Sequence, residues 1–189
     1  MVYEGILEGR FVNLRPVTKE DAEFILEIRN NPEISKFLPS LNATVDQQQS
    51  WIDKQRNDIN SYYFIIEDKT KMRIGTTSVY NIIENHAEVG RFCSFGNSIQ
   101  NSEAALMLDD FIFQKLGINY LDIWVYKDNK SVLALNKRLG CVWEGEGEDE
   151  KGIPYLYGTL TKEGFDIKSQ KIRTVSYTHL RAHETRRHL

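Results

Sequence analysis

One carboxylate stands out in this sequence as a group that could do chemistry. Glu88 lies in the run Ala87-Glu-Val-Gly-Arg-Phe92, which reads as a strand. Strand alternation predicts that Glu88 shares a face with Gly90 and Phe92. A carboxylate in this position suits a general base, which takes a proton directly or through water. The alternative for Glu88 is a surface carboxylate paired with a lysine or arginine.

The value of such a base depends on the pKa of the group that it deprotonates. A lysine with a pKa of about 10.4 is neutral in roughly one molecule in 2,500 at pH 7, a deficit of about 4.6 kcal/mol. An α-amino group with a pKa of about 8 loses only about 1.4 kcal/mol. A base is therefore valuable for a group as basic as a lysine and optional for a less basic amine.

A polar loop that leads into a helix is the second candidate site. Residues 96–101 form the loop, and 102–116 are expected to be helical because Ala105, Leu108 and Ile112 recur at helical spacing. The first N–H groups of a helix lack partners within it, and that end carries about half a positive charge. The start of this helix therefore suits a phosphate group.

Two polar residues end the first expected helix, ahead of Pro32. Arg29 and Asn30 are suited to bind a diphosphate or a carboxylate. The alternative is that they only cap the helix and complement its dipole.

The expected elements follow the order β-α-α-β-β-β-α-β-α-β-β. Capping boxes at Thr18 and Thr44 begin the first two helices. Helices alternate with strands in the second half, which predicts a parallel pair joined by a right-handed crossover. We therefore expect the α/β class: a mixed, mostly antiparallel sheet with a splayed parallel pair and helices on both faces. The expected strands are 9–15, 62–66, 72–82, 87–95, 120–126, 141–145 and 154–161.

The 189 residues suit one domain, expected over 1–174, with a tail at 175–189 outside the fold. Residues 175–185 resemble a translated sequencing adapter, which indicates an artefact. The alternative is a basic tail that binds an acidic partner. Without 175–189 the chain has 21 basic and 26 acidic residues, a balance of −5 against −3 for the whole chain, which disfavours nucleic-acid binding.

The remaining composition predicts a reduced, metal-free protein of the cytoplasm. No apolar run is long enough to span a membrane, and no secretory signal is recognisable at the start. The two cysteines, Cys93 and Cys141, form no CxxC pair. His86 is the only histidine before the tail, so a site with several histidine ligands is excluded.

Four segments in this order resemble the GNAT superfamily of N-acetyltransferases, over about 9–165. Within it, the sequence is similar to enzymes that acetylate ribosomal-protein N-termini and to amino-sugar acetyltransferases. The segments are Leu14-Arg-Pro with Ile28-Arg-Asn-Asn-Pro32, Ala87-Glu-Val-Gly-Arg-Phe92, Ser102-Glu-Ala-Ala-Leu106, and Asn129-Lys-Ser-Val with Lys137-Arg-Leu-Gly140 and Trp143-Glu-Gly145.

The resemblance implies acetyl-CoA as co-substrate, bound without a metal between the strands at 87–95 and 120–126. It places the pantetheine arm against the backbone near the end of the first strand, and the diphosphate at the start of the helix near Ser102. Asn129 would contact the pantetheine arm, or alternatively only cap its helix. The implied cofactor-binding residues are Phe92, Cys93, Ser94, Gln100, Asn101, Ser102, Glu103 and Asn129.

The resemblance also implies the reaction: direct acetyl transfer to a primary amine of a small-molecule or peptide acceptor. The acceptor would be a protein N-terminus or a nucleotide-linked amino sugar. Glu88 would be the general base, and Arg29 and Asn30 would lie at the acceptor site. The sequence departs from the family in the loop at 96–101, which lacks a basic residue and paired glycines, and at Asn136, where a tyrosine is common. These departures leave two alternatives: a catalytically silent binding protein, or an enzyme that uses another acyl-CoA or an acyl carrier protein. A homodimer is left open.

Overall fold

The computed structural model describes residues 3–170 and 172–173. Its contacts divide the chain into two compact units, with the boundary between Asn119 and Tyr120. Each unit contains its own run of antiparallel strands. The expected tail at 175–189 lies outside the described residues, so the domain boundaries remain a prediction.

The first unit is built on an antiparallel meander. Its strands follow one another in space as they do in the chain, so each pairs with the next. The strands are β1 (Leu7–Glu8), β2 (Val12–Pro16), β3 (Tyr62–Asp68), β4 (Arg73–Ile83) and β5 (His86–Ser94). A two-residue turn joins β4 to β5, because Ile83 pairs with His86. The antiparallel first half is therefore as the sequence predicts.

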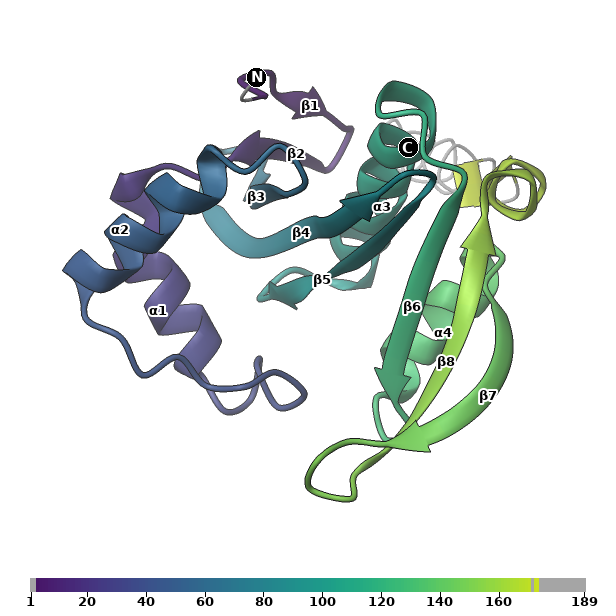
Figure 1. The fold of residues 1–189 in the computed structure, drawn as a ribbon. Coiled ribbons are helices and arrows are strands. Elements are labelled where there is room, and N and C mark those ends of the chain that lie inside the picture. Colours follow the sequence, from purple (N-terminus) through teal and green to yellow (C-terminus); the bar gives the residue numbers. More distant parts are fainter. Residues whose placement is uncertain (1–2, 171, 174–189) are drawn as a thin grey trace, which may run out of the picture. The chain divides into compact units, whose positions relative to one another are not determined.

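Strand β3 is apolar on both faces because helices cover both (Figure 1). On one face, Tyr63 and Ile65 pack in a buried cluster with residues of α1 (Ala22–Asn30) and α2 (Val45–Arg56). On the other, Phe64 contacts Phe111, which follows α3 (Ser98–Asp110), with ring centroids 5.4 Å apart. The face under α1 and α2 is the one that carries the candidate site.

Capping boxes begin the helices of this unit, as the sequence predicts for the first two. The backbone N–H of Thr18 donates to the carboxylate of Asp21, and a short 3₁₀ turn, η1 (Lys19–Asp21), leads into α1. Thr44 and Gln47 exchange side-chain and backbone bonds at the start of α2. These bonds satisfy N–H groups that a helix start leaves open.

The helix expected at 102–116 begins four residues earlier than predicted. A third capping box, Asn97 with Gln100, starts α3 at Ser98. The helix ends in a π-helical turn, η2 (Phe111–Lys115), ahead of Gly117. The earlier start matters because it changes which N–H groups lie at the end of the helix.

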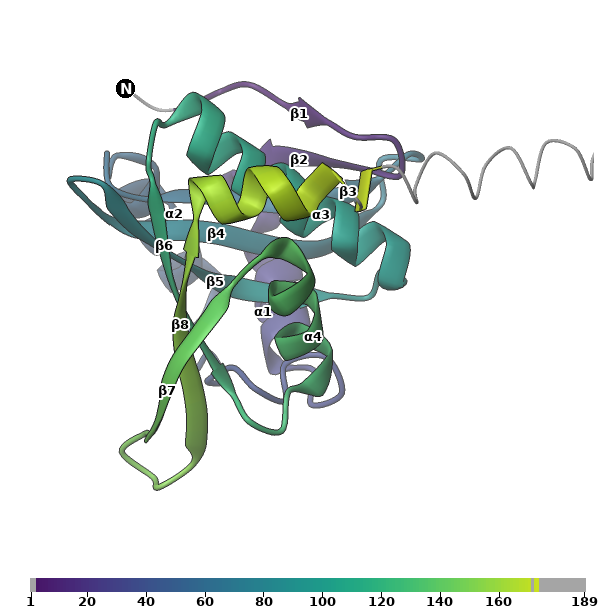
Figure 2. The same ribbon diagram turned by 90° about the vertical axis from the view of Figure 1, so that its right-hand side faces the viewer.

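The second unit is a three-stranded antiparallel sheet with α4 (Lys130–Leu139) beside it (Figure 2). Its strand order is β6-β8-β7, with β6 (Tyr120–Tyr126), β7 (Val142–Glu148) and β8 (Pro154–Thr161). Gly140 ends α4 at a φ of 112°, which a residue with a side chain rarely adopts. Residues 162–170 and 172–173 are helical, beyond the last element that the sequence predicted.

Candidate functional site

A β-bulge in β5 shapes the candidate site. Thr76 of β4 pairs with Cys93 and Ser78 pairs with Gly90, so Thr77 alone lies opposite Arg91 and Phe92. Arg91 has a φ of 51°, in the left-handed region that non-glycine residues seldom occupy. The bulge moves Cys93, instead of Phe92, to the face of Glu88. The predicted shared face of Glu88 and Phe92 is therefore wrong, because it assumed an unbroken ladder.

Two buried hydroxyl groups of β4 satisfy carbonyls at the bulge. Thr76 Oγ1 donates to the Arg91 carbonyl oxygen at 2.8 Å, and Ser78 Oγ donates to that of Gly90 at 3.1 Å. Both hydroxyl residues are fully buried. Because an unsatisfied buried carbonyl is costly, these bonds fix the backbone that carries Arg91.

Glu88 lies on β5 directly opposite Tyr80 of β4. Its Oε1 accepts a hydrogen bond from Asn81 Nδ2 at 2.9 Å, and the side chain is half-buried. None of the ion pairs among the described residues includes Glu88, so the alternative of a lysine- or arginine-paired carboxylate is not what the structure contains. The arrangement leaves Oε2 available for a proton.

Tyr80 brings a phenol to the same place. Burial, with the nearby charge of Glu88, raises the pKa of Tyr80, so it stays protonated at neutral pH. A Cβ atom placed on Gly90 would lie only 2.6 Å from the hydroxyl oxygen of Tyr80. Glycine at position 90 therefore makes room for the Tyr80 ring.

Arg91 is held by aromatic rings. Its guanidinium carbon lies 4.3 Å from the ring centroid of Tyr80, 5.4 Å from that of Trp51 and 5.8 Å from that of Tyr63. Nη1 donates to Ser78 Oγ at 3.2 Å. Burial lowers the pKa of Arg91, and the charge of Arg29 lowers it further. The rings thus hold a desolvated cation.

Arg29 is the second cation of this region. It is 7% exposed, donates from Nη2 to the Pro39 carbonyl oxygen at 2.8 Å, and has a buried Nε with no hydrogen-bond partner. Its charge acts on Tyr63, Arg91 and Cys93. The sequence placed Arg29 at an acceptor site. In the structure α1, which carries Arg29, contacts β5, which carries Arg91, a residue to which the sequence gave no role.

Asn30, the other expected acceptor residue, has a structural task. Its amide exchanges two hydrogen bonds with the backbone of Leu41, from Nδ2 at 3.0 Å and to Oδ1 at 2.9 Å. This pair closes the loop between α1 and α2. Asn30 therefore shapes the loop, and its use in substrate contact stays a prediction.

Three expected cofactor residues lie at the end of β5. Cys93 is 2% exposed, and its thiol is within hydrogen-bond distance of Thr76 Oγ1. Burial raises the pKa of the thiol, which disfavours the nucleophilic thiolate at neutral pH. Phe92 and Ser94 are half-buried. Ser94 Oγ accepts from the Gly96 N–H at 2.8 Å.

The start of α3 is closed by its own side chains. Asn97 Oδ1 accepts from the N–H groups of Ile99 at 2.9 Å and Gln100 at 3.1 Å. Gln100 Oε1 accepts from the Asn97 N–H at 3.0 Å, and Asn101 Nδ2 donates to the Gly96 carbonyl oxygen. A phosphate at this helix end would have to displace these bonds. The expected diphosphate residues therefore present fewer free donors than an uncapped helix offers.

Glu103 faces another part of the first unit. Its carboxylate accepts three backbone hydrogen bonds, from Arg10 at 2.9 Å, Phe11 at 2.6 Å and Val12 at 2.8 Å. The repulsion that this charge would exert on a phosphate is reduced, because the carboxylate is used to anchor the start of β2. Ser102 lies in the second turn of α3.

Asn129 belongs to the second unit, where it caps α4. Its Oδ1 accepts from the Val132 N–H at 3.4 Å and from Ser131 Oγ at 3.2 Å. Asn136, at the position of the family's tyrosine, donates to the Val132 carbonyl oxygen of its own helix at 3.0 Å. The capping alternative for Asn129 is thus present, and its contact with a cofactor stays a prediction.

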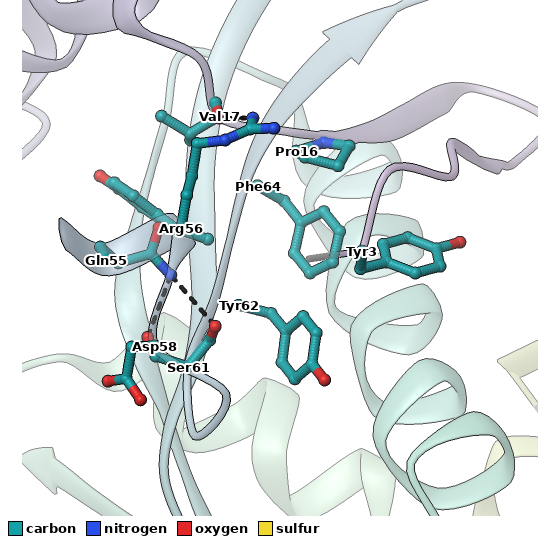
Figure 3. A pocket seen from close by; sticks show the side chains of 10 residues that line it. Tyr3, Pro16, Val17, Gln55, Arg56, Asp58, Ser61, Tyr62 and Phe64 are labelled. Carbon is teal, nitrogen blue, oxygen red and sulfur yellow. Dashed lines mark hydrogen bonds between the residues drawn. The ribbon is translucent and has the colours of Figure 1, made fainter. Parts of the chain in front are cut away.

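A pocket beside β2 and β3 is a weaker candidate (Figure 3). Arg56 donates to Glu4 and to the Val17 carbonyl oxygen, and Gln55 donates to Ser61. These polar groups already have partners within the protein, so the pocket offers few sites for a ligand.

Neither a metal-binding cluster nor a membrane-spanning helix occurs among the described residues. Residues 3–170 and 172–173 contain no cluster of three or more His, Cys, Asp or Glu placed to hold a metal ion. In the same part of the chain, every helix is too short or too polar to cross a membrane.

The sequence matches the acetyltransferase (GNAT) domain over residues 12–142, so the chain belongs to the GNAT acetyltransferase family. It is similar to the acetyltransferase PseH of Campylobacter jejuni strain 81-176, with 24% identity over 125 residues that cover 65% of this chain and 78% of PseH. PseH of strain NCTC 11168 is 23% identical over 128 residues.

Solved structures share the fold. FdhC, a nucleotide-linked sugar GNAT, matches with a TM-score of 0.77 and 25% identity, over 92% of this chain and 98% of FdhC. A variant of the spermidine N-acetyltransferase SpeG from Vibrio cholerae matches with a TM-score of 0.70 and 19% identity, over 82% and 95%. The expected α/β class and acyl-CoA N-acyltransferase fold are confirmed.

Proposed function

We propose that this chain moves an acetyl group from acetyl-CoA to the primary amine of a nucleotide-linked amino sugar. The observation that carries the proposal is Glu88 in a chain of the GNAT family, with one carboxylate oxygen held by Asn81 and the other free. The likeness to FdhC supports a sugar nucleotide as acceptor over a protein N-terminus.

The reaction needs a neutral amine and no covalent intermediate on the enzyme. The amine nitrogen attacks the thioester carbonyl carbon, a C–N bond forms, and the C–S bond breaks. Glu88 takes the proton that the amine loses, directly or through water. The CoA thiolate leaves and is protonated. The raised pKa of Cys93 fits this direct route, because that thiol stays protonated and buried.

A second candidate differs only in the donor. The capping box of α3 occupies N–H groups that a donor diphosphate would otherwise bind. That observation favours a donor whose thioester is recognised mainly through its pantetheine arm, such as an acyl carrier protein. Competition between acetyl-CoA and an acyl carrier protein separates the two donors.

Acetyl transfer by the full chain tests the proposal. The protein is incubated with acetyl-CoA and a uridine-diphosphate-linked amino sugar, and both thiol release and acetyl gain by the sugar are measured. We expect both signals in equal amounts. A peptide N-terminus is the competing acceptor. Absence of acetyl gain with both acceptors, at saturating acetyl-CoA, would favour a catalytically silent binding protein.

Binding of the donor is checked separately by thermal unfolding with and without acetyl-CoA. Ligand at 100 times its Kd adds about 2.7 kcal/mol to the free energy of unfolding. Stabilisation by acetyl-CoA without acetyl transfer would support acetyl-CoA as the donor and contradict the proposed acceptor.

A further inference from the structure

We propose that Arg29 and Arg91 form the binding site for the diphosphate of the acceptor. This inference rests on the proposed function, and it names the part of the acceptor that this region of the first unit would hold.

Neither arginine has a carboxylate partner. Among the ion pairs of the described residues, none includes Arg29 or Arg91, although Arg29 is 7% exposed and Arg91 is half-buried. Glu88 acts on Arg91 only through its field. Buried charges are normally paired because desolvation is costly, so two neighbouring cations without a counter-charge need an explanation.

Most of their hydrogen-bond donors are unused. A guanidinium has five N–H donors in a planar fork. Arg29 uses one on the Pro39 carbonyl oxygen, and its Nε is buried without a partner. Arg91 uses one on Ser78 Oγ. Arg29, held by the loop after α1, and Arg91, on the bulge in β5, thus present two guanidinium groups. Their remaining N–H groups can donate hydrogen bonds to an anion.

The aromatic rings orient Arg91 without using those donors. Tyr80, Trp51 and Tyr63 contact the guanidinium through their ring faces, the closest at 4.3 Å. A stacked guanidinium keeps its N–H groups at its edge, where they can bind two oxygens at once. Trp51 is 37% exposed and Arg91 is half-buried, so the Arg91 side of the site meets solvent.

A diphosphate fits the two charges better than a lone carboxylate does. Two guanidinium groups carry two positive charges, and an esterified diphosphate carries two negative charges on oxygens spaced for bidentate contacts. A single carboxylate would leave one cation without a counter-charge. A sugar nucleotide contains such a diphosphate, which connects this site to the proposed acceptor.

Calorimetric titration of the full chain with inorganic pyrophosphate tests the site without requiring turnover. We expect saturable binding that weakens roughly 10- to 100-fold in Arg91→Met and in Arg29→Met, as loss of a charge-assisted contact implies. Arg73→Met is the matched control, because Arg73 pairs with Asp21, and it should bind like the parent. Equal binding in all four proteins, or none in the parent, would overturn the proposal.

Kinetics assign the diphosphate to acceptor or donor. Arg91→Met should raise KM for the nucleotide-linked amino sugar by about tenfold or more and leave KM for acetyl-CoA unchanged. A raised KM for acetyl-CoA alone would assign the site to the donor and overturn the proposal. Weakened pyrophosphate binding without any acetyl transfer would reject the proposed function while leaving the anion site intact, so the two failures can be told apart.

Discussion

Two pairs of arginines in the first unit differ in whether a carboxylate balances their charge. Arg15 and Arg73 both contact Asp21, whose carboxylate is 2% exposed and accepts from Arg15 at 2.7 and 2.8 Å. Arg15 also pairs with Glu67. Arg29 and Arg91 have no such carboxylate.

The difference separates charges that stabilise the fold from charges that await a ligand. A buried ion pair is strongly destabilising to break, because the remaining charge has no partner. A buried cation without a counter-charge has that cost in the folded protein already, and a bound anion can remove it. The first pair should therefore matter for unfolding, and the second for binding.

The largest expected effect is on Asp21. Asp21→Asn leaves Arg15 and Arg73 without their shared counter-charge and should lower the free energy of unfolding by about 3–5 kcal/mol, toward the lower end because Arg15 keeps Glu67. Urea unfolding of the variant and the parent measures this. A loss below about 1 kcal/mol would show that this ion pair is not the stabilising one.

The pH dependence of the free energy of unfolding tests the contribution of the Asp21 carboxylate in a second way. Burial alone raises the pKa of Asp21, but Arg15, the Thr18 N–H and Arg73 outweigh it and lower the pKa. A lowered pKa in the folded state gives stability that is present above the unfolded value of about 3.9 and is lost as pH falls through the folded value. The free energy of unfolding of the parent should therefore fall toward pH 3 more than that of Asp21→Asn. Parallel losses in both proteins would contradict the assignment.

Glu88→Gln should lower kcat/KM by roughly 10²–10⁴-fold at neutral pH, because the amide keeps the shape and cannot take a proton. The bond from Asn81 can persist on the amide oxygen, so folding should be little affected. A steady-state pH profile checks this. A nearly unchanged rate with a flat profile would remove Glu88 from the mechanism.

Arg91→Met sharpens the comparison through stability. Because the substitution removes one of two like charges and keeps an apolar chain against the aromatic rings, the free energy of unfolding should stay within about 1 kcal/mol of the parent, or rise. Arg15→Met, measured in the same urea titration, should lose markedly more. Equal losses would mean that both arginines serve the fold.

A modest effect is expected at the start of α3. Asn97→Ala removes a cap and should cost about 0.5–2 kcal/mol of stability. It also frees the N–H groups of Ile99 and Gln100, so acetyl-CoA should bind about fivefold more tightly by calorimetry, a gain worth one net hydrogen bond. Thr44→Ala removes the equivalent cap of α2 and should lower stability alone. Weaker acetyl-CoA binding in Asn97→Ala would show that the cap assists the donor.

Much of the fold was readable because its signals are local. The capping boxes at Thr18 and Thr44 mark helix starts, and the sequence predicts both. The start of α3 was misplaced although Asn97-x-x-Gln100 repeats the Thr44-x-x-Gln47 pattern, so the signal was present in the sequence.

The candidate site was readable only in part. Glu88 and Arg29 could be selected from residue type and position. The role of Arg91 could not, because it depends on a bulge that breaks strand alternation and on rings from α2, β3 and β4. Contacts between residues so distant in the chain leave no local pattern.

The most direct measurement compares two acceptors that differ only in the nucleotide. With acetyl-CoA saturating, kcat/KM is determined for a uridine-diphosphate-linked amino sugar and for the same amino sugar without the nucleotide. If the protein binds the diphosphate while it acetylates the amine, kcat/KM should be roughly 10- to 100-fold higher for the nucleotide-linked sugar. Equal values would contradict the account, since the amine alone would then be what the protein recognises.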